Sequence, residues 1–123
     1  MHDSQRKKLL IVLTKAPYGS SAIQEALDIV LAAGTFDQDV SLLITLDACY
    51  LLLPSQEPGL IQQKNSAKIL NALPMYGIEK IFVNGKDATR RGLKSETISL
   101  PAHFMNQTEI ADLYAQADTV FRF

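Results

Sequence analysis

The sequence is short of cysteine, histidine and net charge, and each shortage excludes a class of protein. Its 123 residues include one cysteine and two histidines. We therefore expect neither an internal disulfide nor a metal site of recognisable ligand spacing. The net charge is −1, from 12 basic and 13 acidic residues. That balance predicts no standing attraction to nucleic acid or to anionic lipid.

Long apolar runs are missing as well. The run LLIVL (9–13) follows the charged stretch MHDSQRKK and is too short for the core of a signal peptide. No run approaches the roughly 18 apolar residues of a membrane helix. We therefore expect a cytoplasmic protein. Because 123 residues lie near the commonest domain size, we expect one domain over residues 1–123, with 1–7 as a flexible tail.

The apolar segments that are present alternate between strand and helix patterns. Short branched runs bounded by turn residues predict strands, and 3.6-residue spacing predicts helices. The strands are expected at 8–13, 39–45, 78–84, 96–101 and 118–123, and the helices at 22–34, 61–73 and 106–117, with a helical turn within 85–93. We expect Gly34 to close the first helix and Thr108 to cap the last. Since parallel strands need crossover connections, the order predicts a three-layer α/β fold with a mostly parallel five-stranded sheet.

The lone Cys49 has two interpretations. It lies in the run DACYLLLP, and free cysteine is among the most buried residue types, so it is expected to pack as a small hydrophobe. A reactive thiol would need a pKa lowered by nearby cations or a helix N-terminus, and the neighbouring Asp47 has the opposite sign. Packing is the favoured interpretation.

Ligands of such sheets bind beyond the carboxyl ends of the strands, where three loops are expected. The first loop carries Pro17, Tyr18 and Gly19 ahead of a helix and is a candidate anion site. It lacks the remaining glycines of a dinucleotide fingerprint and the Gly-Lys-Ser/Thr ending of a P-loop. An ordinary strand-to-helix turn explains the same residues, and no cofactor is expected.

The second loop, LLLPSQEPG, includes Leu52, Leu53 and Pro54. Its apolar start is expected either to pack on the protein's own core or to form a patch for a partner. The stiff, proline-bounded stretch fits both interpretations.

The third loop carries the cations Lys86, Arg90 and Arg91. They are candidates for binding an anion or lowering the pKa of a thiol, but solvated charge near a helix end is the favoured interpretation. Whether Asp47 and Asp87 meet at the strand ends is not decided by their spacing.

Five segments in order along the chain carry a family resemblance: KAPYGSSAIQEALD, LLLPSQEPG, MYGIEKIFV, RRGL and the terminal VFRF. Together they resemble the DsrE/DsrF-like family, and within it the DsrF-type (TusC) branch. The resemblance implies a flavodoxin-like α/β fold. It also implies a subunit of a sulfur-relay complex for 2-thiolation of the tRNA wobble uridine.

The resemblance further implies partners and a division of labour. Such complexes hold two copies each of TusB-like, TusC-like and TusD-like subunits, and pass sulfur to a TusE-like acceptor. The carrier cysteine of the TusD-like subunit lies eight residues before the glycine of its Arg-Gly pair. The same count back from Gly92 reaches Asn84, which cannot carry a persulfide. The resemblance therefore implies an accessory subunit without a catalytic residue, and not an enzyme by itself.

Four alternatives stay open. The first is a direct persulfide carrier through Cys49, and the second is a DsrF-type subunit in intracellular sulfur oxidation. The third is a small-anion-binding α/β module, and the fourth is a homo-oligomer of the isolated chain. Direct contact with nucleic acid is not expected, because no basic stripe with interleaved aromatic residues is present. No membrane contact is expected.

Overall fold

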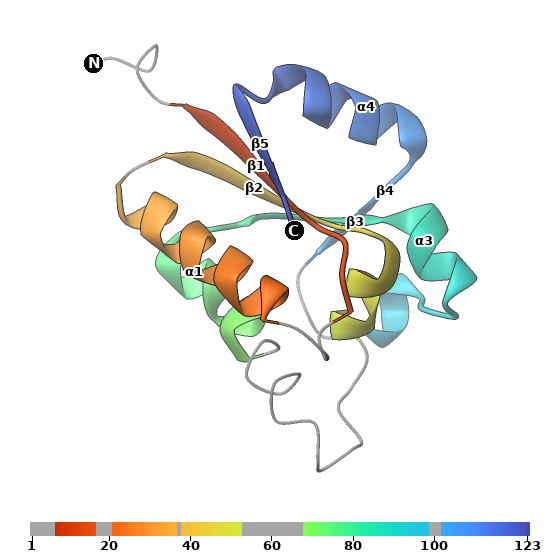
Figure 1. Ribbon diagram of the computed structural model, residues 1–123. Helices are drawn as coiled ribbons and strands as arrows, with labels where there is room; N and C mark the ends of the chain where they lie inside the picture. Colours follow the sequence, from red (N-terminus) through yellow and green to blue (C-terminus); the bar gives the residue numbers. More distant parts are fainter. Residues whose placement is uncertain (1–6, 17–20, 37, 53–67, 99–101) are drawn as a thin grey trace.

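Five parallel strands form the centre of the molecule (Figure 1). They are β1 (Lys8–Leu13), β2 (Asp39–Ile44), β3 (Lys80–Asn84), β4 (His103–Met105) and β5 (Thr119–Arg122), in the spatial order β4-β3-β2-β1-β5. The computed structural model describes residues 7–16, 21–36, 38–52, 68–98 and 102–123; of the expected tail at 1–7, residues 1–6 lie outside them. The predicted α/β class with a five-stranded parallel sheet is confirmed. Flavodoxin itself has the order 2-1-3-4-5 and shares the doubly wound plan.

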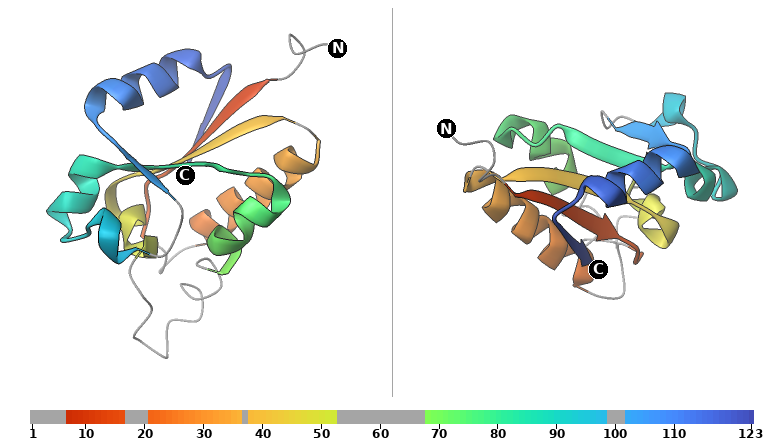
Figure 2. Two further views of the ribbon diagram at one scale, coloured as in Figure 1. Left: turned by 180° about the vertical axis from the view of Figure 1, so that it is seen from behind. Right: turned by 90° about the horizontal axis from the view of Figure 1, so that it is seen from above.

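The strand order decides which face of the sheet each helix covers. The chain moves one way from β1 to β4, and right-handed crossovers place all of those connections on one face. Between β4 and β5 the direction reverses, so α4 (Gln107–Gln116) lies on the opposite face, as Figure 2 shows. The first face holds α1 (Ala22–Thr35), a helical segment over 68–72 continued by η3 (Leu73–Tyr76), η2 (Leu46–Leu52) and α3 (Gly85–Arg90).

The larger core lies on the α1 face. Alternate strand residues point there, including Ile11, Val40, Leu42 and Ile81, and each is at most 6% exposed. The helices above add buried apolar side chains: Ile23, Ala26, Leu27, Val30, Leu70, Leu73 and Ala88. This burial is the main stabilising contribution to the fold.

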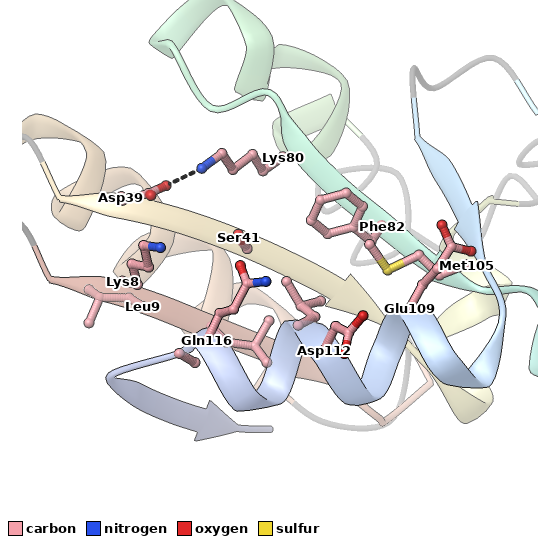
Figure 3. A pocket seen from close by; sticks show the side chains of 13 residues that line it. Lys8, Leu9, Asp39, Ser41, Lys80, Phe82, Met105, Glu109, Asp112 and Gln116 are labelled. Carbon is pink, nitrogen blue, oxygen red and sulfur yellow. Dashed lines mark hydrogen bonds and ion pairs between the residues drawn. The ribbon is translucent and has the colours of Figure 1, made fainter.

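The α4 face is apolar only in part. Leu10, Val12 and Leu43 are fully buried there beneath Ile110 and Leu113 of α4 and Ala117, the residue that follows the helix. The amino-terminal halves of the strands present charged and hydroxyl groups on the same face: Lys8, Asp39, Ser41 and Lys80 (Figure 3). The sheet is therefore sealed on one face and half open on the other.

Two expected helix ends are wrong. α1 runs past Gly34 to Thr35, and Gly34 instead permits a close approach, because a Cβ there would lie 3.1 Å from Cδ1 of Ile78. α4 is capped by Asn106 and not by Thr108: the Asn106 side chain accepts the Glu109 N–H while Glu109 accepts the Asn106 N–H. This reciprocal capping box satisfies two otherwise free donors.

The fourth strand also lies later in the chain than the expected 96–101. Residues 95–97 form the 3-10 turn η4 (Ser95–Thr97), residues 99–101 lie outside the described residues, and β4 begins at His103. Pairing decides this position, since Phe82 of β3 is opposite His103. The alternating ETISL pattern is typical of a strand, but strand propensity yields to tertiary contacts. Of the expected helix 61–73, the residues from 68 on are described and are helical.

Candidate functional site

Asn84 ends β3 and begins α3, at the carboxyl edge of the sheet. Its Oδ1 accepts the backbone N–H of Asp87 at 3.1 Å, and its φ and ψ of −68° and 106° are those of an N-cap. α3 ends as expected around Gly92, which has φ +75°. There the N–H groups of Gly92 and Leu93 bond to the carbonyls of Thr89 and Ala88. The position that the resemblance assigns to a sulfur carrier is therefore occupied by a helix cap.

Asp87 connects α3 to the end of β2. Its side chain is buried, and Oδ2 accepts the backbone N–H of Leu46 at 2.8 Å. Leu46 has φ +51°, the only positive φ of a non-glycine among the described residues. A left-handed conformation costs a residue with a Cβ about 1–2 kcal/mol, and the carboxylate holds the turn in it. The sharp turn directs the chain from β2 into η2.

Arg91 joins the two aspartates. Its Nη2 and Nε bond to Oδ1 of Asp47 at 2.8 and 3.2 Å, and its Nη1 donates to the carbonyl oxygen of Asp87 at 3.0 Å. The guanidinium carbon lies 5.8 Å from the ring centroid of Tyr50, within cation–π range. The hydrogen bond that Arg91 donates to Asp47 holds the pKa of Arg91 above its ordinary value. The guanidinium of Arg91 is thus engaged in contacts within the protein and is not a free cation.

Cys49 lies beneath this cluster in the core. Its side chain is 0% exposed, and Sγ is 4.0 Å from the carbonyl oxygen of Ile44. Burial, followed by the charge of Asp87, raises the pKa of the thiol to about 12; Arg91 opposes the shift and Asp47 adds to it. The thiol is consequently neutral near pH 7 and has no access to a reagent.

The other candidate residues separate into three groups. Lys86 and Arg90 are exposed on α3 and make no ion pair within the part of the chain that the structure describes. Leu52 packs in the core and is 7% exposed. Five candidates lie outside the described residues: Pro17, Tyr18, Gly19, Leu53 and Pro54.

The point where the strand order reverses lies between β1 and β5, and this is where open α/β sheets bind ligands. Here Thr14 donates its N–H and its Oγ1–H to the carbonyl of Phe123, at 2.7 and 2.6 Å. Next to it, Thr45 donates to the carbonyl of Leu13 at 2.8 Å. These bonds join the carboxyl ends of β1, β2 and β5 directly to one another.

The sequence left open whether Asp47 and Asp87 meet, and the structure joins them through the candidate Arg91, although the structural role of Asp87 was not expected. Asn84 and Asp87 have the three-residue spacing of a helix N-cap and its third residue, and Arg91 follows Asp87 by one helical turn. Nε2 of His103 lies 3.5 Å from Oε2 of Glu109. Over the described ranges, no three His, Cys, Asp or Glu side chains gather as a metal site would need. None of the helices described there is long and apolar enough to cross a membrane.

Comparison with known proteins gives relatives along most of the chain. A TusC homolog of Pseudomonas aeruginosa is 35% identical and covers 93% of this chain and 96% of its own. A TusC homolog of Vibrio parahaemolyticus is 30% identical over 94% and 98%. The intracellular sulfur oxidation protein DsrF of Allochromatium vinosum is 32% identical over 95% and 96%.

The fold is likewise shared with a solved structure. The crystal structure of the ychN protein from E. coli superimposes with a TM-score of 0.77 at 23% identity, covering 95% of this chain and 99% of that one. The model of the DsrE/DsrF-like family matches residues 7–123. With these matches, the resemblance seen in the five sequence segments is confirmed: the chain belongs to the DsrE/DsrF-like family.

Proposed function

We propose that this chain is a non-carrier subunit of a cytoplasmic sulfur-relay complex that serves 2-thiolation of the tRNA wobble uridine. The observation that carries the proposal is that Asn84, a helix-capping residue, stands where the resemblance places the carrier cysteine. A sulfur carrier needs an accessible thiol of low pKa. Here the corresponding position holds a capping amide, and the one cysteine of the chain is buried with a pKa of about 12.

Two further features support an accessory role. The relatives that carry the name TusC homolog cover this chain nearly end to end. The exposed cations Lys86 and Arg90 lie on α3, the short helix that Asn84 caps. Placed against a carrier subunit, they would stabilise the negative charge of its persulfide. The chain would then shape and charge a site whose reacting sulfur belongs to a TusD-like partner.

The proposed assembly holds two copies each of this chain and of TusB-like and TusD-like subunits, and delivers sulfur to a TusE-like acceptor. To test it, the tagged chain is purified from its own host and the intact assembly is weighed by native mass spectrometry. We expect two further family members, with a persulfide on one of them. The Cys49→Ala variant is the matched control and should recover the same assembly with the same persulfide. Recovery of this chain alone, with an extra sulfur atom on Cys49, contradicts the proposal.

The likeness to DsrF of Allochromatium vinosum favours a second candidate, a subunit that acts in intracellular sulfur oxidation. Deleting the gene separates the two. Loss of 2-thiouridine from bulk tRNA, measured by nucleoside mass spectrometry and restored by the wild-type chain, supports the relay to tRNA. Unchanged thiolation together with impaired oxidation of stored sulfur supports the second candidate.

A further inference from the structure

A groove runs along the α4 face, between α4 and the first halves of β1, β2 and β3 (Figure 3). Its volume is about 330 Å³. The half-buried side chains of Phe82, Met105 and Leu113 form its apolar part, and Ser41 lies on its floor. The groove is therefore an apolar strip with polar margins.

The groove exists because one helix cannot cover this face. Five strands at about 4.8 Å spacing span about 19 Å between the outer strands, and a helix with its side chains is about 10 Å wide. On the opposite face, α1, the segment 68–76, η2 and α3 share the same width. Apolar faces of sheets are stable when another element covers them, so the α4 face is suited to a partner.

The charges of the groove are arranged in a definite direction. α4 runs antiparallel to the strands, so its first turns lie near the carboxyl ends of the strands and its last turn near their amino ends. Figure 3 accordingly shows Lys8 and Lys80 toward one end of the groove, with Glu109 and Asp112 toward the other. One end is basic and the other acidic.

Two of these charges have no counterpart among the residues that the structure describes. Lys80 pairs with Asp39 at 2.7 Å, and Glu109 caps Asn106. The ammonium group of Lys8 and the carboxylate of Asp112 make no hydrogen bond or ion pair within the described ranges, and both residues are exposed. The two unpaired charges are opposite in sign and lie toward opposite ends.

We propose that the groove binds the same groove of a second copy of this chain, related by a twofold axis. Such an interface is isologous, so each residue contact occurs twice. With the axis lying across the groove, the two grooves run antiparallel, which brings Lys8 of each copy to Asp112 of the other. The apolar strips around Phe82 and Leu113 cover one another between these charge pairs. The contact does not depend on the proposed function, since it needs only two copies of this chain.

Charge reversal in the full-length chain tests the interface. Sedimentation over a concentration series measures the dimer Kd for the wild type, Lys8→Glu, Asp112→Lys and the double variant. Each single reversal places two like-charge pairs in the dimer and should weaken it by at least about tenfold. The double variant restores opposite charges and should return most of the affinity. Asp28→Lys, on the exposed side of α1, is the matched control and should leave the Kd unchanged.

The outcomes are distinct. A chain that stays monomeric at all concentrations overturns the proposal, as does a dimer that both single reversals leave intact. A related subunit that binds the groove while this chain never self-associates also overturns it. Weakening in both single variants without recovery in the double variant assigns the dimer to another surface. Should a reversal unfold the chain, the neutral variants Lys8→Gln and Asp112→Asn replace it, with a weakening of about threefold or more expected.

Discussion

The carboxylate of Asp87 accepts a 2.8 Å hydrogen bond from the backbone N–H of Leu46, a residue 41 positions earlier in the chain. This bond joins the first turn of α3 to the left-handed turn that follows β2. Arg91 extends the connection to Asp47, so α3 and η2 are held together over the buried Cys49. The carboxyl edge of the sheet is thus organised around a structural acid and not around a nucleophile.

Replacing Asp87 by alanine should destabilise the protein. The Leu46 N–H loses its acceptor in a turn that is already strained, and a hydrogen bond to a charged group contributes about 1.5–3 kcal/mol. Asp87→Asn keeps an oxygen acceptor and should lose less. Urea unfolding measures both variants. An alanine variant as stable as the wild type would show that the bond contributes nothing.

The thiol of Cys49 should resist alkylation in the native protein. With a pKa of about 12, roughly one thiol in ten thousand is ionised at a pH of about 8, and the sulfur is also fully buried. Iodoacetamide labelling followed by intact mass measures the reaction. We expect no adduct in buffer and complete labelling in denaturant. Rapid labelling of the folded chain would return Cys49 to the candidates for sulfur carriage.

The same thiol should make stability fall at alkaline pH. Below its unfolded value of 9.0 the thiol is protonated in both states, so its contribution is fully present. As the pH rises from about 9 to about 12, the unfolded chain releases the proton and the folded one keeps it, and the free energy of unfolding drops by up to about 1.4 kcal/mol per pH unit.

Cys49→Ala is the control that isolates this effect, because it leaves the other titrating groups in place. Unfolding is measured at a pH of about 8 and of about 10 for both chains. The wild type should lose about 1 kcal/mol more than the variant over that interval. Equal losses would mean that the thiol titrates alike in both states.

A cysteine placed at position 84 should be far more reactive than Cys49. Asn84 is only partly buried at the edge of the sheet, so Asn84→Cys in a Cys49→Ala background presents one thiol outside the core. Losing the capping amide should cost about 1 kcal/mol of stability. Labelling kinetics with iodoacetamide measure the reactivity. A thiol at position 84 as protected as Cys49 would show that this edge is closed to solvent.

The elements with strong local signals were predictable. α1 repeats apolar residues at helical spacing, and β1 is a continuous apolar run, so both agree closely with expectation. β4 has three residues at the edge of the sheet, and its position depends on pairing with β3. Its local pattern is therefore a poor guide, and the expected strand at 96–101 was several residues too early. Asn106 prevailed over Thr108 as a cap because only Asn106 has a glutamate three residues later.

The sequence by itself determined the α/β class, the parallel sheet and the lack of a thiol at position 84, because these follow from apolar periodicity and residue identity. Only the tertiary structure decided what the remaining polar residues do. Asp87 meets Leu46 and Arg91 meets Asp47 through contacts 41 and 44 residues apart in the chain. Likewise, Lys8 and Asp112 share a groove only because the reversal of strand order sends α4 to the otherwise open face. Local patterns do not encode such distances, because the stacking of strands sets them.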